Sequence, residues 1–227
     1  MKYIIIGLGN FGASLAQKLT EQGNEVIGVD KNMARVDANK DKVSHTICLD
    51  STDQYLVAEL PLANTDIVIV AIGEDQGANI MTTAVLKNLN VKRLISRAIT
   101  PLHENVLQAI GVDEIVHPEE ETAERWAKKL CIKGVVDSYE INGRYSIVEI
   151  TISDRFANKT LGEIGFRTNY NLVVLTTLKV REERNFFGAQ RKIHEVQGIA
   201  SYDTVLHKGD IMVIYGDNKD IKRILND

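Results

Sequence analysis

The chain has 227 residues, of which 44% are hydrophobic and 26% charged, and its formal charge is −4 at pH 7. This length allows one domain or two modest ones, and the composition is that of an ordinary soluble protein. The sequence lacks an apolar run of about 18 residues, a signal-peptide pattern and a dense basic segment, so we expect a cytoplasmic protein that binds no nucleic acid.

The chain opens with an apolar run of strand length at residues 3–6, the glycine-rich segment GLGNFG at 7–12, and an amphipathic helical pattern from 11 to 22. A strand, G-x-G-x-x-G and a helix in this order are typical of a dinucleotide-binding turn. The first glycine allows a tight turn, the second lets backbone N–H groups approach a pyrophosphate, and the third lets the helix pack closely on the sheet. The helix N-terminus offers N–H donors and a partial positive charge to the phosphates.

A second apolar run, Val26–Val29, leads into Asp30, eighteen positions after Gly12. A carboxylate at this place accepts hydrogen bonds from the hydroxyl groups of an adenosine ribose and repels a 2′-phosphate, which disfavours NADP. The alternative is a glycine-rich turn that binds nothing, because the glycine motif alone is a weak signal. The strand, the helix and Asp30 in register favour nucleotide binding.

Strand and helix patterns alternate through the rest of the first half. The strands are expected at 44–49, 67–72, 93–97 and 114–117, and the helices at 33–39, 54–60, 77–89, 102–110 and 119–130. Six alternating strands predict an α/β fold with a doubly wound, Rossmann-like parallel sheet, because the crossovers are right-handed. Ligands bind beyond the carboxyl ends of such strands, where the polar cluster 50–53 falls. Trp126 and Leu130, on the last helix, are expected in a core or a subunit interface.

From about residue 133 the pattern changes to short strands with few helices. A short strand and a turn are expected at 137–144, strands at 145–152, 172–175 and 210–216, and helices at 160–164 and 218–225. We interpret the polar run 181–194 as an extended, irregular hairpin loop whose Phe186 and Phe187 form a contact surface or a disordered tip. The second half is therefore a smaller α+β domain.

Cysteine and histidine spacing gives no sign of a metal centre. Cys48 and Cys131 match neither a C-x-x-C redox pair nor a zinc-ligand spacing, and the five histidines share no ligand spacing. We expect no disulfide and no structural metal, and we place both thiols in the core or near the surface.

Taken together, the patterns resemble the regulatory subunits of Trk/Ktr-type potassium uptake systems, in which a regulator-of-potassium-conductance (RCK, TrkA-N) domain precedes a TrkA-C domain. The resemblance covers residues 1–179 and 198–225 and is carried by segments 7–12, 50–52, 70–73, 97–98, 111–119, 161–164 and 206–210, with Asp30 and Arg167. The segment 111–119, GVDEIVHPE, is more specific than the glycine motif. The predicted domains are a nucleotide-binding RCK/TrkA-N domain at 1–132 and a TrkA-C domain at 138–227.

The resemblance implies a cytosolic homo-oligomer, from a dimer to an octameric ring, that binds an adenine nucleotide. It would gate a separate integral-membrane potassium-translocating subunit at the inner face of the membrane. The nucleotide-site residues so implied are Gly7, Gly9, Asn10, Phe11, Gly12, Asp30, Lys31, Asp50, Ser51, Ala71, Ile72, Gly73 and Arg97. The glycines and Arg97 would meet phosphates, and Asp30 the ribose. Asp50, Ser51 and Ala71 would border the adenosine.

Asn10 departs from the family pattern, because ATP-responsive members often carry a basic residue between the second and third glycines. An asparagine donates a hydrogen bond but brings no charge. The missing charge argues against a preference for a triphosphate and leaves NAD, NADH, ADP and AMP as candidates.

Three further assignments have a simpler alternative. Arg97 either reaches a phosphate or forms a solvated surface pair. Glu119 corresponds to a carboxylate that joins a cation site between paired subunits in some family members, or it complements a helix N-terminus. Arg167 and Tyr170 hold cyclic di-AMP, as in the TrkA-C domains of some relatives, or they form a surface turn.

We expect a regulator rather than an enzyme, in which the bound nucleotide shifts the balance between two conformations. One alternative is an NAD-dependent oxidoreductase, which needs a proton-transfer residue and an anion clamp that the second half does not supply convincingly. The other is a regulator of a potassium/proton antiporter, which shares every feature of this sequence.

Overall fold

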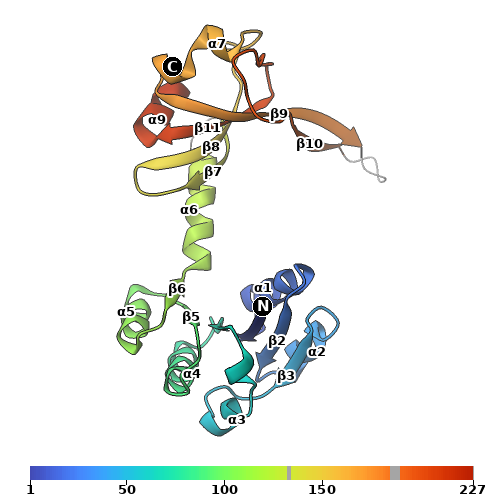
Figure 1. The fold of residues 1–227 in the computed structure, drawn as a ribbon, viewed down its shortest axis with the longest axis vertical. Coiled ribbons are helices and arrows are strands. Elements are labelled where there is room, and N and C mark those ends of the chain that lie inside the picture. Colours follow the sequence, from blue (N-terminus) through green and yellow to red (C-terminus); the bar gives the residue numbers. More distant parts are fainter. Residues whose placement is uncertain (132–133, 185–189, 227) are drawn as a thin grey trace. The chain divides into compact units, whose positions relative to one another are not determined.

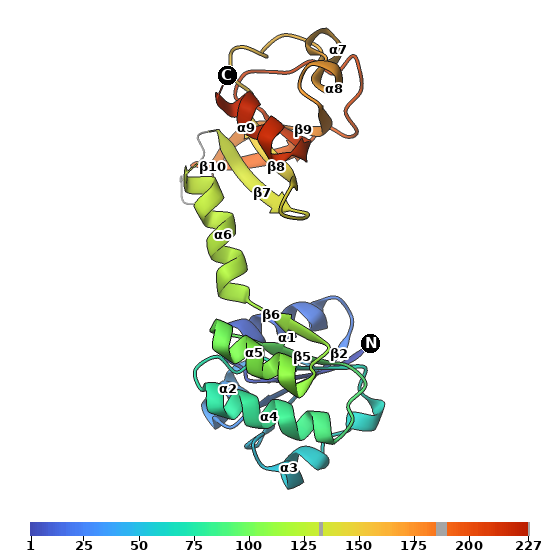
Figure 2. The same cartoon turned by 90° about the vertical axis from the view of Figure 1, so that its left-hand side faces the viewer.

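A computed structural model describes residues 1–131, 134–184 and 190–226 of the chain. The chain divides into two compact units, Met1–Glu119 and Glu120–Asp227 (Figures 1 and 2). The sequence-based boundaries, 1–132 and 138–227, differ from this division at helix α6 (Pro118–Cys131), most of which belongs to the second unit. Among the helices in the described ranges, none combines the length and apolar character needed to cross a membrane.

The first unit is built on a six-stranded sheet in the order β3-β2-β1-β4-β5-β6, and all its strand pairs are parallel. The strands are β1 (Lys2–Ile6), β2 (Glu25–Asp30), β3 (His45–Cys48), β4 (Ile67–Val70), β5 (Leu94–Arg97) and β6 (Glu114–Val116). The helices are α1 (Asn10–Glu21), α2 (Met33–Asn39), α3 (Gln54–Ala58), the 3₁₀ turn η1 (Leu62–Asn64), α4 (Gln76–Asn88) and α5 (Pro101–Ile110). The predicted doubly wound, Rossmann-like sheet is confirmed.

Strand β1 is central in this sheet, and its side chains alternate between two cores. Ile4 and Ile6 pack with side chains of α3 and α4 on one face, and Ile5 packs with Ala16 of α1 on the other. Helices α4 and α5 lie side by side (Figure 2). All three isoleucines are at most 1% exposed. Burial on both faces explains why the central strands read as unbroken apolar runs.

Local capping fixes where four of the helices begin. The side chains of Asn32, Asp53, Asp75 and Thr100 accept hydrogen bonds from first-turn N–H groups of α2, α3, α4 and α5. Such caps satisfy donors that the helix itself leaves unpaired. Each cap lies in the loop that follows a strand, so the loops at the carboxyl edge of the sheet are held by their own side chains.

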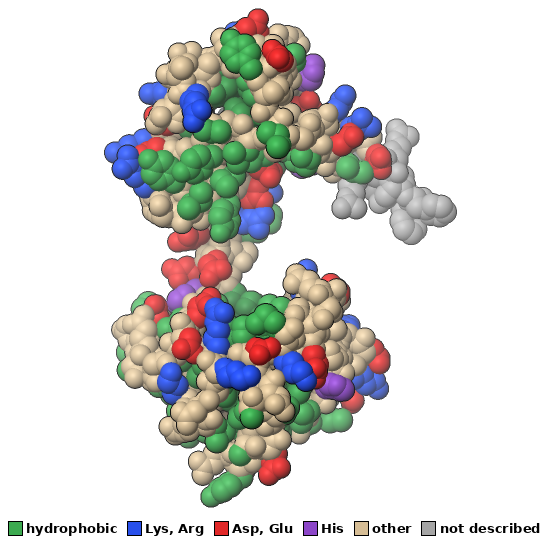
Figure 3. Space-filling model, viewed as in Figure 1, with side chains coloured by type: hydrophobic (Ala, Val, Ile, Leu, Met, Phe, Trp, Pro, Cys, Tyr) green, Lys and Arg blue, Asp and Glu red, His purple; other side chains and the backbone are tan. Residues whose placement is uncertain are grey.

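The second unit contains a five-stranded antiparallel sheet in the order β10-β9-β11-β8-β7. Its strands are β7 (Val135–Glu140), β8 (Tyr145–Thr151), β9 (Leu172–Arg184), β10 (Gln190–Val196) and β11 (Ile211–Asp217). Besides most of α6, its helices are α7 (Leu161–Ile164), α8 (Phe166–Asn169) and α9 (Asn218–Asn226). Leu172, Leu206 and Ile214 are fully buried in the core under one face of the sheet. Hydrophobic side chains also gather on the outside of this unit (Figure 3). Val173 and Leu175 of β9, for example, are 38% and 39% exposed.

The run 181–194, predicted as an extended, irregular hairpin loop, does form a hairpin, but its described part is a regular pair of strands. Strand β9 continues to Arg184 and pairs with β10 from Gln190 onward. Arg181 bridges to Glu195 across the pair at 3.0 Å. Charged side chains line an exposed two-stranded ribbon here, so the apolar alternation that marks a half-buried strand is missing from the sequence. Phe186 and Phe187 lie outside the described residues.

The expectation of a core position for Trp126 and Leu130 is also wrong within this chain. Their exposed fractions are 52% and 76%, and α6 buries no side chain. The alternative, a subunit interface, stays a prediction. Cys48 and Cys131 are exposed free thiols, so neither lies in the core.

Candidate nucleotide-binding site

A cavity of about 350 Å³ opens beyond the carboxyl ends of the strands of the first unit. It is lined by Gly7, Gly9, Asn10, Phe11, Asp30, Lys31, Arg35, Asp50, Ser51, Ala71, Ile72, Gly73, Glu74, Asp75, Ala78, Arg97 and Glu119. Every residue predicted for the site lines it except Gly12. Arg35, Glu74, Asp75 and Ala78 were not predicted. The volume falls within the range of about 300–1,000 Å³ that is usual for small-molecule sites.

The three glycines of the motif have separate structural roles. Gly7 has a φ of +98°, in the left-handed region that favours glycine, and its N–H donates to the Val29 carbonyl at 2.7 Å. A Cβ on Gly12 would overlap the carbonyl oxygen of Gly7, so this glycine allows α1 to lie against the turn. A Cβ on Gly9 would meet nothing within 4 Å. Gly9 is therefore the position where the backbone faces open space in the cavity.

Helix α1 begins at the cavity without a side-chain cap. Its N-cap residue is Gly9, and its first turn contains no acidic side chain. This differs from α2 to α5, whose first-turn N–H groups are already bound by a side chain. An uncapped helix N-terminus with N–H groups directed into a cavity favours an anionic group.

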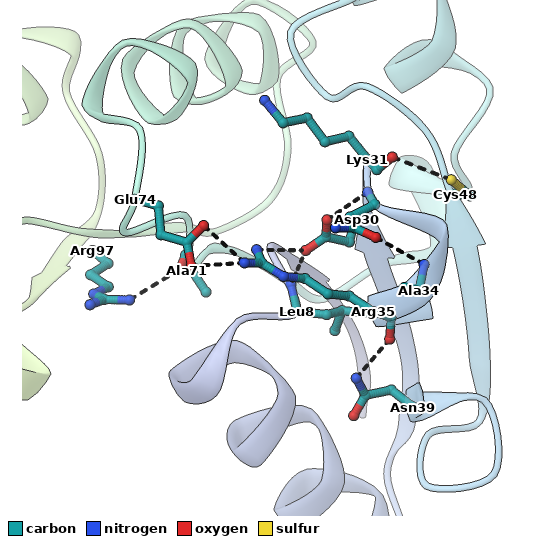
Figure 4. Close-up of polar contacts among 11 residues, drawn as sticks. Leu8, Asp30, Lys31, Ala34, Arg35, Asn39, Cys48, Ala71, Glu74 and Arg97 are labelled. Atoms are coloured by element: carbon teal, nitrogen blue, oxygen red, sulfur yellow. Dashed lines mark hydrogen bonds and ion pairs between the residues drawn. The ribbon is translucent and has the colours of Figure 1, made fainter. Parts of the chain in front are cut away.

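Asp30 ends β2 and its carboxylate is fixed in place from two sides. One oxygen accepts a hydrogen bond from the N–H of Leu8 at 2.7 Å and the other from the N–H of Asn32 at 2.8 Å (Figure 4). The residue is 6% exposed, yet it lines the cavity. Each carboxylate oxygen has a further lone pair available to accept from a ligand hydroxyl.

Arg97 ends β5 and reaches across the cavity floor. Its Nη2 donates to Glu119, its Nη1 lies 3.4 Å from the Ala71 carbonyl oxygen, and its guanidinium is 5.8 Å from the centre of the Phe11 ring. The guanidinium fills the space that a side chain on Gly73 would need. Its side chain is 15% exposed, and its buried Nε has no hydrogen-bond partner among the described residues. Arg97 is thus not a solvated surface residue, although it is paired.

Two predicted residues after β3 are engaged in local structure. Asp50 accepts from the N–H and the hydroxyl of Thr52, at 3.0 and 2.7 Å, and these bonds hold the pKa of its carboxyl below the ordinary range. The Ser51 hydroxyl lies 2.8 Å from that of Thr82 in α4 and is buried. Both residues still line the cavity, and these hydrogen bonds fix their side chains.

An ion pair that the sequence analysis missed stands beside Asp30. The Nη2 atom of Arg35, in α2, lies 2.8 and 2.9 Å from the two carboxylate oxygens of Glu74, which follows β4 (Figure 4). Its Nη1 lies 3.8 Å from Asp30. These residues meet only because the strand order brings the loops after β2 and β4 to the same edge. Charged residues are common throughout the sequence, so their charge does not identify Arg35 and Glu74 as residues of the site.

Beneath the cavity, the buried Asn79 of α4 ties two strand ends together. Its amide nitrogen donates to the carbonyls of Ile72 and Arg97, at 3.0 and 3.1 Å. Its amide oxygen accepts from the Ser96 hydroxyl and lies 3.1 Å from Nε2 of His103. Three hydrogen-bonding residues thus support the segments that carry Ile72 and Arg97.

The residues suggested for cyclic di-AMP lie in the second unit. The Tyr170 ring packs against Phe156 and Phe166, and its hydroxyl is 2.9 Å from an Arg155 guanidinium nitrogen. Arg167 is exposed on α8. Within the described residues, no group of three or more His, Cys, Asp or Glu side chains is placed to hold a metal ion. The assignments of Arg167, Tyr170 and Glu119 to ligands stay predictions.

A family model of the TrkA-N domain matches residues 3–118. The chain belongs to the TrkA-N family. This TrkA-N protein is 36% identical over 222 residues to the Ktr system potassium uptake protein C of Bacillus subtilis, with 98% of this chain and 95% of the relative covered. It is 29% identical over 226 residues to the Ktr system potassium uptake protein A of the same organism, with 100% and 96% covered. The family resemblance drawn from the sequence is confirmed.

Solved structures agree on the fold. The GsuK channel superimposes with a TM-score of 0.66 at 19% identity, and the GsuK RCK domain with a TM-score of 0.64 at 19% identity. They match 98% and 99% of this TrkA-N protein, which spans 38% and 47% of their own chains. At this level of identity the likeness shows an RCK-type fold.

Proposed function

We propose that this TrkA-N protein is the nucleotide-binding regulatory subunit of a Ktr-type potassium uptake system. The observation that carries the proposal is its similarity to two Ktr system potassium uptake proteins over at least 95% of their lengths. The partner is an integral-membrane potassium-translocating subunit, and the protein works at the cytoplasmic face of the membrane as a homo-oligomer. Residues 138–227 form its TrkA-C domain.

The ligand of the cavity is an adenine nucleotide. The uncapped N-terminus of α1 suits the phosphates, Asp30 suits the ribose hydroxyls, and Arg97 suits a phosphate oxygen. Structures of GsuK have been solved with NAD and with ADP, which makes both nucleotides the first candidates. Ligand binding needs no chemical step in this function. One nucleotide state favours one conformation of the assembly through its differential affinity.

An oxidoreductase is the competing function, and the cavity favours it less. Hydride transfer coupled to proton transfer needs a general acid or base near the nicotinamide. Among the described residues that line the cavity there is no histidine, tyrosine or cysteine, and Lys31 is the only lysine. Asp30 and Asp50 are engaged with backbone N–H groups.

Gly9→Asp tests the site, because it places a carboxylate where the pyrophosphate is expected. The fold should tolerate the side chain, since a Cβ at this position meets nothing within 4 Å. The matched control is Gly143→Asp, which adds the same charge at an equally open glycine in the second unit. We expect NAD, NADH, ADP or ATP to raise the melting temperature of the native protein and the control, but not of Gly9→Asp. Equal shifts in all three proteins would refute the site.

The regulatory role has its own test. Expression of the protein together with a Ktr membrane subunit, in a strain that lacks its own Ktr regulatory proteins, should restore growth at limiting potassium. Gly9→Asp should restore less growth than Gly143→Asp at equal expression. Equal growth at limiting potassium with and without the protein, when the membrane subunit is expressed in both cases, would overturn the proposed function.

A further inference from the structure

We propose that Glu74 makes this site reject adenine nucleotides that carry a 2′-phosphate, because it engages the Arg35 guanidinium that would otherwise bind that phosphate. The inference rests on the proposed nucleotide site and adds two specificity-determining residues to it.

The position of Arg35 relative to Asp30 is the first observation. A carboxylate at the end of the second strand of a dinucleotide-binding sheet contacts the ribose 2′-hydroxyl, and an arginine beside it accommodates a 2′-phosphate in NADP-binding proteins. This protein has both groups. Asp30 ends β2, and Nη1 of Arg35 lies 3.8 Å from its Oδ2 in the wall of the same cavity (Figure 4).

The second observation is that Glu74 already forms an ion pair with Arg35. Both of its carboxylate oxygens lie within 2.9 Å of Arg35 Nη2. The hydrogen bond to Glu74 raises the pKa of Arg35, and the bond to Arg35 lowers the pKa of Glu74. Both directions describe an ion pair that is fully charged at neutral pH.

The local charge then decides which nucleotide is accepted. Asp30 and Glu74 are negative and Arg35 is positive, so the group is negative overall. A 2′-phosphate brings a charge of about −1.5 to −2. A free 2′-hydroxyl brings none and can donate to Asp30. Removing the charge of Glu74 would make the group neutral and release Arg35 for charge-assisted hydrogen bonds to phosphate.

The sharpest test uses two ligands that differ only in the 2′-phosphate, 5′-AMP and adenosine 2′,5′-bisphosphate. Their dissociation constants are measured by calorimetry on the full-length native protein, on Glu74→Gln, and on Glu74→Gln combined with Arg35→Gln. The ratio of the two constants cancels changes that affect both ligands equally, such as altered folding. Lys31, which also lines the cavity, is the same in all three proteins, so it does not account for a change in the ratio between them.

We expect the native protein to bind the bisphosphate at least tenfold more weakly than 5′-AMP. Glu74→Gln should reduce this ratio about tenfold, the size expected for a newly available charge-assisted hydrogen bond. The added Arg35→Gln change should restore the high ratio, since the cation is gone. The double-mutant comparison isolates the arginine as the group that Glu74 controls.

Three results would overturn the inference: a native protein that prefers the bisphosphate, a ratio unchanged within about twofold in Glu74→Gln, or a reduced ratio that persists without Arg35. In each of these cases the proposed nucleotide site survives if 5′-AMP binds. Failure of the native protein to bind 5′-AMP, ADP and NAD would reject the proposed function, and the inference with it.

Discussion

The buried pair of Asn79 and His103 shows how single residues shape the floor of the site. The two carbonyl oxygens near Asn79 require its amide nitrogen as donor, which leaves its amide oxygen to face Nε2 of His103. We therefore assign the proton to Nε2. Nδ1 is buried and has no hydrogen-bond partner in the part of the chain that the structure describes, and burial lowers the pKa of the imidazole. His103 is a neutral donor in the folded protein.

This neutral histidine predicts a pH dependence of stability. The pKa of His103 is lower in the folded protein than in the unfolded chain, so the unfolded chain binds more protons. The contribution of His103 to the free energy of unfolding is therefore lost as the pH falls below about 6.5, the ordinary pKa of histidine. His103→Leu should lower the free energy of unfolding at pH 8 by about 1 kcal/mol, because the hydrogen bond to Asn79 is lost. The free energy of unfolding of this variant should then decrease less than that of the native protein as the pH falls. Melting temperatures of both proteins between pH 8 and pH 5 provide the measurement. Parallel curves would show that His103 does not titrate on unfolding.

At the scale of elements, the turn from β1 into α1 is where sequence and structure agree most closely. The same is true of α2, predicted at 33–39 and observed from Met33 to Asn39. Both agree because local chemistry determines them: a glycine motif in one case, and an Asn32 cap in the other. The regular strands of the β9–β10 hairpin were not predicted, because their residues pair with each other and bury little, so no apolar period marks them.

The close approach of α1 to the turn leads to an element-level prediction. Gly12→Ala puts a Cβ into the carbonyl oxygen of Gly7 and within 3.0 Å of the Ala71 Cβ, so the helix must move away from the sheet. We expect a loss of about 1–3 kcal/mol in the free energy of unfolding, measured by urea denaturation, together with weaker nucleotide binding.

Gly77→Ala is the matched control for that change. Gly77 lies in the first turn of α4, where a Cβ meets only the Asp75 side chain at 3.4 Å. Its substitution should be neutral or slightly stabilising, because alanine favours a helix more than glycine does. Equal stability of both variants would show that α1 does not need to lie so close to the turn.

At the scale of the whole molecule, every residue that lines the cavity belongs to the unit Met1–Glu119. That unit has apolar cores on both faces of its sheet. A unit with its own core can fold alone. The chain therefore carries its candidate nucleotide site and its antiparallel sheet in separable parts.

A fragment of residues 1–119 tests this separation. It should fold cooperatively and bind ADP or NAD with a dissociation constant within about threefold of the full-length value, measured by calorimetry. It retains both Arg97 and Glu119, the two partners of the ion pair in the cavity. A folded fragment that binds more than tenfold more weakly would mean that residues beyond 119 complete the site.

The sequence by itself determined the strand–turn–helix motif, Asp30, the alternation that makes a parallel sheet, and the family. These features are local, because a period, a cap or a glycine acts on its immediate neighbours. Only the tertiary structure decided which side chains face Asp30. Arg35 and Glu74 are far apart in the chain and meet because β2 and β4 flank β1. Asn79, a buried residue of α4, donates a hydrogen bond to the carbonyl of Ile72, which lines the cavity. Contacts across strands depend on strand order, which no local pattern encodes.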